Sequence, residues 1–138
     1  MPGNPLAKPA VIPTPETAPF WHGAAAGKLL FQVCGACGHT QFPPRPVCLN
    51  CRGTALDWRE SAGRGSVFSF TVVHRAPLDS FRVDVPYVVA LIDLEEGPRM
   101  MMNIRRCAPE QVRIGAPVIT FFESYAEGVA LPQAMLEE

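Results

Sequence analysis

The chain has 138 residues and a formal net charge of −1, and 48% of its residues are hydrophobic while 18% are charged. This length suits one domain or two very small ones, and the hydrophobic share is typical of a globular protein. No apolar run approaches the ~20 residues that a membrane-spanning helix needs, so we expect no membrane segment. Nucleic-acid-binding modules usually carry a clear basic excess, which this near-neutral composition lacks.

The start of the chain is rich in proline and has no apolar stretch of the kind that a signal peptide carries. We therefore expect a cytoplasmic protein whose cysteine thiols stay reduced. Residues 1–15 include five prolines and show no periodicity. This composition predicts an extended, disordered arm over residues 1–14.

A helical segment is expected over residues 15–28. Thr14 is a suitable N-cap, Pro15 fits the first helical position, and Glu16 complements the helix dipole. Pro19 would lie inside such a helix, where proline removes a backbone hydrogen bond. We therefore expect the segment to break into two short turns.

Four of the five cysteines fall into two Cys-x-x-Cys pairs, Cys34 with Cys37 and Cys48 with Cys51. Each pair places two thiolates on one tight turn, and two such turns complete the tetrahedral sulfur shell that zinc prefers. The ten residues between the pairs are enough for a small hairpin. Four thiolates leave no open position on the metal, so the sequence predicts a structural zinc site.

Two other uses of these cysteines stay open: a disulfide pair and a redox-active Cys-x-x-Cys motif. A secreted disulfide scaffold would normally follow a signal peptide, and a thioredoxin-like motif has one pair beside a βαβ pattern. Neither setting matches two pairs in a proline-rich hairpin. The fifth cysteine, Cys107, is interpreted as a half-buried thiol, although the two preceding arginines could lower its pKa.

A small zinc ribbon is predicted over residues 29–60. Residues 29–33 have strand character and enter the metal site, and residues 56–60 return from it as a second strand. Gly38 and Gly53 follow the two cysteine pairs. We expect both glycines to adopt positive φ, so that backbone N–H groups turn toward the sulfurs.

The remaining chain, residues 61–138, shows the pattern of five short antiparallel strands. These strands are predicted at residues 66–74, 87–94, 99–104, 118–123 and 125–135. In the first of them, Phe68, Phe70 and Val72 are expected to share one face. The strand number and lengths fit a five-stranded Greek-key barrel of the OB type. The predicted fold class is therefore mainly β, with a short N-terminal helical arm, a zinc ribbon and a C-terminal OB-fold barrel.

The order of these features resembles the DUF35 family of acyl-CoA-associated zinc-ribbon plus OB-fold proteins. The resemblance covers about residues 15–136 and depends on several short motifs besides the cysteine pairs. These motifs are Phe20-Trp21, Gln32-Val-Cys34-Gly-Ala-Cys37-Gly38, Phe42-Pro-Pro-Arg45, Cys48-Leu-Asn-Cys51, Gly63-Arg-Gly65-Ser-Val67, Pro86-Tyr87-Val-Val-Ala90 and Glu96-Gly97-Pro-Arg99.

The resemblance implies N-terminal helices, a rubredoxin-like zinc ribbon and an OB fold. Members of the family look like partners of thiolase-superfamily enzymes in lipid metabolism, among them thiolases, acyltransferases and thiolase-like aldolases. The resemblance implies that the chain is a non-catalytic accessory subunit, which scaffolds or bridges such an enzyme or helps to form its acyl-CoA channel.

Candidate contact residues follow from this interpretation. Phe20, Trp21 and Phe81 are aromatic side chains suited to anchor a partner interface. Coenzyme A phosphates favour arginine, because its guanidinium group makes bidentate phosphate contacts. The candidates for this contact are Arg64, Arg75, Arg82 and Arg99, within a wider group that includes Arg105 and Arg106.

No catalytic residue is predicted, because His22, His39 and His74 are scattered and the sequence has no glycine-rich phosphate loop. A metal-dependent enzyme would need an open zinc position and a nearby base, and neither is visible. The alternative function is a nucleic-acid-binding zinc-ribbon/OB module, which would need Phe68 and Phe70 to point outward and stack on bases. Homodimerisation through a barrel edge also stays open.

Overall fold

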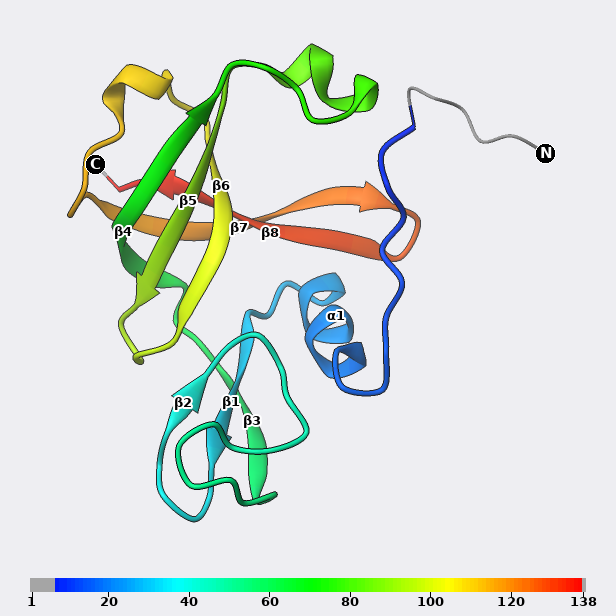
Figure 1. The fold of residues 1–138 in the computed structure, drawn as a ribbon, viewed down its shortest axis with the longest axis vertical. Helices are drawn as coiled ribbons and strands as arrows, with labels where there is room; N and C mark the ends of the chain where they lie inside the picture. Colours follow the sequence, from blue (N-terminus) through cyan, green and yellow to red (C-terminus); the bar gives the residue numbers. More distant parts are fainter. Residues whose placement is uncertain (1–6, 138) are drawn as a thin grey trace.

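The computed structural model describes residues 7–137, so residues 1–6 of the predicted arm and residue 138 lie outside the described part. The described chain forms a three-stranded ribbon, one short α-helix and a closed five-stranded barrel (Figure 1). The predicted fold class is therefore confirmed. No helix within residues 7–137 is long and apolar enough to cross a membrane.

Helix α1 (Ala18–Ala25) begins later than the sequence suggested. Its N-cap is Thr17, and the predicted cap Thr14 lies in a preceding turn, where its carbonyl accepts the N–H of Ala18 at 2.8 Å. Pro19 occupies one of the first two helical positions, where a backbone N–H has no partner within the helix. The predicted start at Thr14 was wrong because a proline fits the first turn of a helix better than its interior.

The ribbon consists of β1 (Leu30–Cys34), β2 (Thr40–Gln41) and β3 (Leu56–Glu60), in the order β2-β1-β3. Both neighbours pair antiparallel with β1. Successive side chains of a strand point to opposite faces. Phe31 accordingly lies in the hydrophobic core shared with the barrel, while Gln32 faces the loops of the metal site. The ribbon therefore has one apolar and one polar face.

The barrel strands follow one another in the closed order β4-β5-β6-β8-β7. Their bounds are β4 Arg64–Val73, β5 Tyr87–Leu94, β6 Arg99–Arg105, β7 Pro117–Ala126 and β8 Val129–Leu136. Two 3₁₀-helices lie in the connections: η1 (Asp79–Asp84) between β4 and β5, and η2 (Pro109–Gln111) between β6 and β7. Buried and half-buried residues alternate along β5, as expected for a strand with one face in the core.

A bulge in β4 changes the predicted pattern of its aromatic residues. The register between β4 and β5 shifts between Val67 and Ser69, which leaves Phe68 as the extra residue. Phe68 is 47% exposed, whereas Phe70 and Val72 pack against the core. The prediction that Phe68 shares their face was wrong, because a bulge interrupts the two-residue alternation of a strand.

Two differences from the predicted strands concern the closure of the barrel. The last hairpin turns at Gly128, where φ is 73°, so β8 begins later than the predicted residue 125. The barrel then closes through a short parallel pairing of β6 with β8. Every described barrel strand has a neighbour on both sides, but β6 and β8 are paired at two positions only, so parts of their edges remain unpaired. Homodimerisation stays a prediction.

The turn between β5 and β6 joins the barrel to the ribbon. The carboxylate of Glu96 accepts hydrogen bonds from the Ser61 hydroxyl at 2.7 Å and from the Ala62 N–H at 2.8 Å. Burial raises the pKa of Glu96, but these two hydrogen bonds outweigh that effect and lower the pKa overall. The contact fixes the point at which the chain leaves the ribbon and enters the barrel.

Residues 7–14 contain no helix or strand and run beside the β7–β8 hairpin (Figure 1). The Lys8 ammonium group lies 3.1 Å from the carboxylate of Asp84, and the Tyr125 hydroxyl donates to the carbonyl of Pro9. This described part of the predicted arm therefore contacts the barrel. The proposed division of the chain stays a prediction, with segments 1–14, 15–28, 29–60 and 61–138.

Candidate functional site

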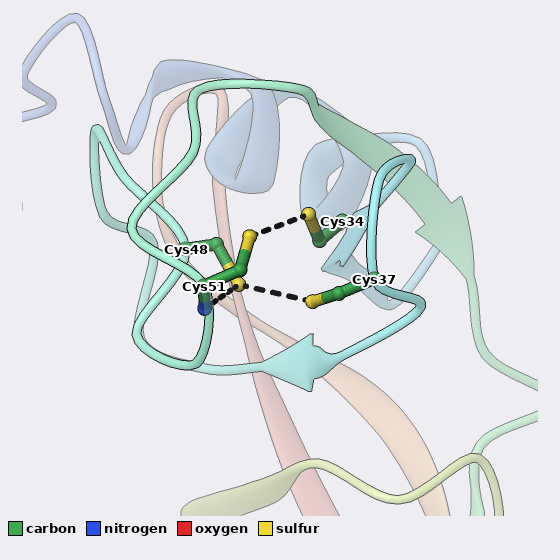
Figure 2. A group of neighbouring side chains, drawn as sticks. All are labelled: Cys34, Cys37, Cys48 and Cys51. Atoms are coloured by element: carbon green, nitrogen blue, oxygen red, sulfur yellow. Dashed lines mark hydrogen bonds between the residues drawn. The ribbon is translucent and has the colours of Figure 1, made fainter.

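The four cysteines of the two Cys-x-x-Cys pairs meet at one end of the ribbon (Figure 2). Cys34 ends β1 and Cys37 lies in the turn after it, while Cys48 and Cys51 lie in the loop between β2 and β3. Their sulfur atoms all lie within 4.8 Å of one another. The structure thus brings all four predicted zinc ligands together.

The sulfur distances fit a tetrahedral metal site. The Sγ atoms are 3.6 Å apart between Cys34 and Cys51, and 3.6 Å apart between Cys37 and Cys48. A tetrahedron with zinc–sulfur bonds of about 2.3 Å has edges of about 3.8 Å, whereas a disulfide joins sulfurs about 2.05 Å apart. The four thiolates therefore form a structural zinc site, and their closed shell leaves no position for a substrate on the metal.

A residue in the left-handed conformation follows each cysteine pair. Gly38 has φ of 78° after the first pair, and Arg52 has φ of 64° after the second. In the second turn, the backbone N–H of Asn50 lies 3.4 Å from Cys48 Sγ. The prediction of positive φ at Gly53 was therefore wrong by one residue, because the chain must reverse directly after the second cysteine of the pair.

The surroundings of the thiols shift their pKa values in opposite directions. A hydrogen bond from the side chain of Asn50 is the main cause that lowers the pKa of Cys37 to about 6. The Gly53 N–H lowers the pKa of Cys51, but the neighbouring cysteine thiols outweigh it and raise that pKa to about 11. Cys37 thus offers a thiolate at neutral pH, which is the form that binds zinc.

Two buried glutamines hold the loops of the metal site, and the sequence analysis did not identify them. The amides of Gln32 and Gln41 share a hydrogen bond of 2.9 Å. Gln32 also bonds the backbone N–H and carbonyl of Arg45, while Gln41 bonds the Val47 carbonyl and the Leu49 N–H. This network fixes the proline-rich segment between the cysteine pairs. The available signal was a glutamine within the apolar run of β1, because a buried amide must find hydrogen-bond partners.

The histidine side chains and the fifth cysteine do not belong to the group of metal ligands, although the backbone of His39 borders the site. His22 is in α1, His39 precedes β2, and His74 follows β4, so the three imidazoles come from different parts of the fold. Cys107 is half-buried, and this burial raises its pKa. The interpretation of Cys107 as a half-buried thiol is therefore confirmed.

The four candidate arginines for coenzyme A contact do not converge. Arg64 and Arg99 begin β4 and β6 at one end of the barrel, while Arg75 and Arg82 lie in the loop at the opposite end. Arg75 has no ion pair within the described residues. The other three are paired: Arg64 with Glu137, Arg82 with Asp79 and Arg99 with Asp93. Contact of these arginines with acyl-CoA stays a prediction.

The three aromatic residues predicted to bind a partner surround one apolar cavity of about 510 Å³. Phe20 is buried, and its ring centroid lies 5.0 Å from that of Trp21 and 5.1 Å from that of Phe42. Phe81 is half-buried and packs 6.3 Å from the ring of Tyr87. The role of these residues in partner binding stays a prediction.

Comparisons with known proteins connect these two parts of the chain to one family. The model for the ChsH2 rubredoxin-like zinc ribbon domain matches residues 21–57, and the model for the ChsH2 C-terminal OB-fold domain matches residues 58–122. A DUF35 domain-containing scaffold protein from Methanothermobacter thermautotrophicus is 35% identical over 114 residues, which are 81% of this chain and 85% of that protein.

A longer relative is the probable enoyl-CoA hydratase alpha subunit from Thermomonospora curvata, which is 42% identical over 101 residues, or 72% of this chain. The match covers 31% of that protein, so the chain spans about a third of its length. The solved structure named "Ltp2-ChsH2(DUF35) aldolase" has a TM-score of 0.82 and 34% identity, and it covers 94% of this chain and 98% of its own. The chain therefore belongs to the DUF35 family.

Proposed function

We propose that this chain is a non-catalytic accessory subunit of a thiolase-superfamily acyl-CoA enzyme, which is a thiolase, an acyltransferase or a thiolase-like aldolase. The observation that carries the proposal is the match over 94% of this chain to a structure whose name joins a DUF35 chain with Ltp2 in an aldolase. The subunit would scaffold that enzyme in the cytoplasm.

The chemistry of the described residues supports a non-catalytic role. The zinc site is completed by four thiolates, and such closed sites stabilise a fold rather than activate a substrate. The three histidines lie in separate parts of the fold, and no histidine side chain in the described chain forms a hydrogen bond with a serine or cysteine. Some relatives are named hydratase subunits, which makes a direct test of activity useful.

The loop between β4 and β5 supports a docking role because it presents apolar side chains to solvent. Val83 is 84% exposed, and Leu78 in the same loop is also exposed, and exposed apolar side chains that form a larger patch are typical of a protein-protein contact. Phe81 lies between them in sequence and lines the same cavity as Trp21. We place the contact with the partner enzyme at this loop and at the neighbouring rim of α1.

A tagged pull-down from the native host, followed by mass spectrometry, tests the proposal. We expect a stoichiometric thiolase-superfamily protein with the wild-type bait, and at least a tenfold loss with Val83→Asp. Ile114→Asp is the matched control, since Ile114 is 71% exposed but lies in a different loop, before β7. Recovery of the chain alone, or with nucleic acid, would contradict the accessory role.

Direct contact with acyl-CoA is a separate part of the proposal. Among the candidate arginines, Arg75 has no carboxylate partner in the described chain, so its guanidinium group is free to contact a phosphate. Calorimetry with acetyl-CoA should show heat that Arg75→Ala reduces more than Arg82→Ala, since Arg82 is paired with Asp79. No heat at millimolar acetyl-CoA would exclude binding by the subunit alone.

The nucleic-acid alternative depended on two outward-facing phenylalanines. Phe68 points outward, but its ring is covered by the Arg99 guanidinium group at 3.5 Å from the ring centroid. Phe70 packs against the core. The structure does not provide the stacking pair that this alternative needs, and we do not propose it.

A further inference from the structure

Strands β6 and β8 are paired over a short stretch only, and an apolar cavity lies where they separate. The two strands are paired at Ile104 with Ala134 and at Arg105 with Met135, and they diverge beyond these pairs (Figure 1). The cavity of about 510 Å³ lined by Trp21 and Phe81 lies at this divergence. Its volume is within the range of about 300–1,000 Å³ that is typical of small-molecule sites.

The walls of this cavity are apolar and come from several parts of the fold. Trp21 belongs to α1, Phe42 to the segment between the cysteine pairs, Phe81 to η1, Met101 to β6 and Leu131 to β8. None of the described residues that line the cavity carries a charge. This lining favours an uncharged ligand, because an ionised group held against it would lose water without gaining a partner. The phosphates of coenzyme A therefore do not belong in this cavity.

One buried amide interrupts the apolar lining. Gln133 is 2% exposed, lines the cavity, and accepts the backbone N–H of Asn103 at 3.1 Å through its Oε1 atom. A backbone N–H can only donate, so this contact fixes Oε1 toward Asn103 and leaves Nε2 as the free end of the amide. Nε2 has no hydrogen-bond partner among residues 7–137. A ligand that fills the cavity displaces water from this donor, so a ligand that supplies an acceptor in its place should bind better than one that does not.

We propose that this cavity binds an uncharged, apolar molecule whose carbonyl oxygen accepts a hydrogen bond from Gln133 Nε2. A compact molecule suits the site better than an extended peptide, because α1, η1 and two strands surround the cavity on different sides. The Asn103 side chain, which donates to the Val88 carbonyl at 3.0 Å, holds the β6 side of the site in place. Binding requires no partner enzyme.

A pair of matched probes tests this proposal on the full chain. 2-Tetralone and tetralin share one bicyclic skeleton and differ by a carbonyl group. In ¹H–¹⁵N NMR titrations, both should shift the Trp21 indole signal, but 2-tetralone alone should shift the side-chain amide of Gln133. We expect 2-tetralone to bind about three- to tenfold more tightly, the usual net effect of one hydrogen bond.

Two variants distinguish the contribution of the hydrogen bond to binding from that of the apolar walls. Gln133→Met keeps the volume and removes the donor, so the preference for 2-tetralone should disappear. Met101→Glu places a charge on the wall and should weaken both probes by at least fivefold. Because Met101 is 68% exposed, this variant should fold even if Gln133→Met does not. Ile114→Glu, which adds the same charge at an exposed position in the loop before β7, is its control and should leave both affinities unchanged.

Several outcomes would overturn the proposal. Equal affinities for the two probes would show that Gln133 does not select a carbonyl. Unchanged Trp21 and Gln133 signals at the solubility limit of 2-tetralone would show that no such molecule enters. Protection of these two residues by the purified partner enzyme, without binding of either probe, would mean that a protein segment occupies the cavity instead.

Discussion

The barrel and the metal-binding half of the ribbon are stabilised in different ways. In the barrel, one face of β5 is buried along its whole length and contributes to a continuous apolar core. Between residues 34 and 56, the buried side chains are those of Cys34, Gln41 and Cys48. So few buried groups cannot order a segment of this length by hydrophobic burial alone. In this half of the ribbon, the metal and the glutamine network therefore replace an apolar core.

Removing a metal ligand should have the largest effect and should act on the ribbon. Cys48→Ser should abolish stoichiometric zinc binding, since binding of about 10–16 kcal/mol is linked to folding at such sites. Hydrogen exchange should then show lost protection in residues 34–56 while β5 and β6 stay protected. Cys107→Ser, which lies outside the site, should retain one zinc ion per chain. Full protection of residues 34–56 without zinc would show that the metal is not needed to order this part of the ribbon.

Truncating the barrel core should have the next largest effect and should act on the barrel. Ile92 is fully buried in β5, so Ile92→Ala should lower the free energy of unfolding by about 2–5 kcal/mol. Zinc content should remain one ion per chain. Chemical denaturation measures the change, and Met101→Ala, an exposed position on β6, is the control with a change under about 0.5 kcal/mol. Loss of zinc from Ile92→Ala would show that the metal site depends on the barrel core.

The Glu96 contact should make the connection between ribbon and barrel dependent on pH. The pKa of Glu96 is lowered below its ordinary value of 4.5, so its stabilising effect is complete above that value and is lost as the pH falls through the lowered pKa. Glu96→Gln should cost about 1 kcal/mol at pH 7, and the difference from wild type should shrink as the pH falls below 4.5. Urea denaturation across this range, with Glu95→Gln as the control, measures it. A difference that is constant with pH would contradict the assigned role.

The smallest expected effect is a gain in stability within the ribbon. Arg52 has φ of 64°, a conformation that is unfavourable for residues with a side chain, and Gly38 occupies the equivalent position in the first turn. Arg52→Gly should therefore raise the free energy of unfolding of the zinc-bound protein by about 0.5–1 kcal/mol. Arg52→Ala removes the charge but keeps the strain, so it should give no gain. Equal gains from both variants would assign the effect to charge instead.

The zinc ligands could be predicted because their spacing is local: four cysteines on two short turns determine the site with no knowledge of the rest of the fold. The strands of the barrel could also be predicted, because apolar and polar residues alternate along them. The bulge at Phe68 was not, since the extra residue appears only when β4 is aligned with β5. The cavity near Gln133 was hidden for a similar reason, because its walls come from segments far apart in sequence.

The contact between α1 and β8 has a consequence for how the chain is made. The helix precedes every strand in the sequence, yet it packs against β8, from which it is separated by residues 26–128. During synthesis, the zinc ribbon has all its ligands once Cys51 has emerged, whereas α1 must wait until the whole barrel has been translated. A helix this short is not stable alone. Helix α1 therefore completes its packing last, and until β8 has been synthesised the side of the helix that faces this strand stays uncovered.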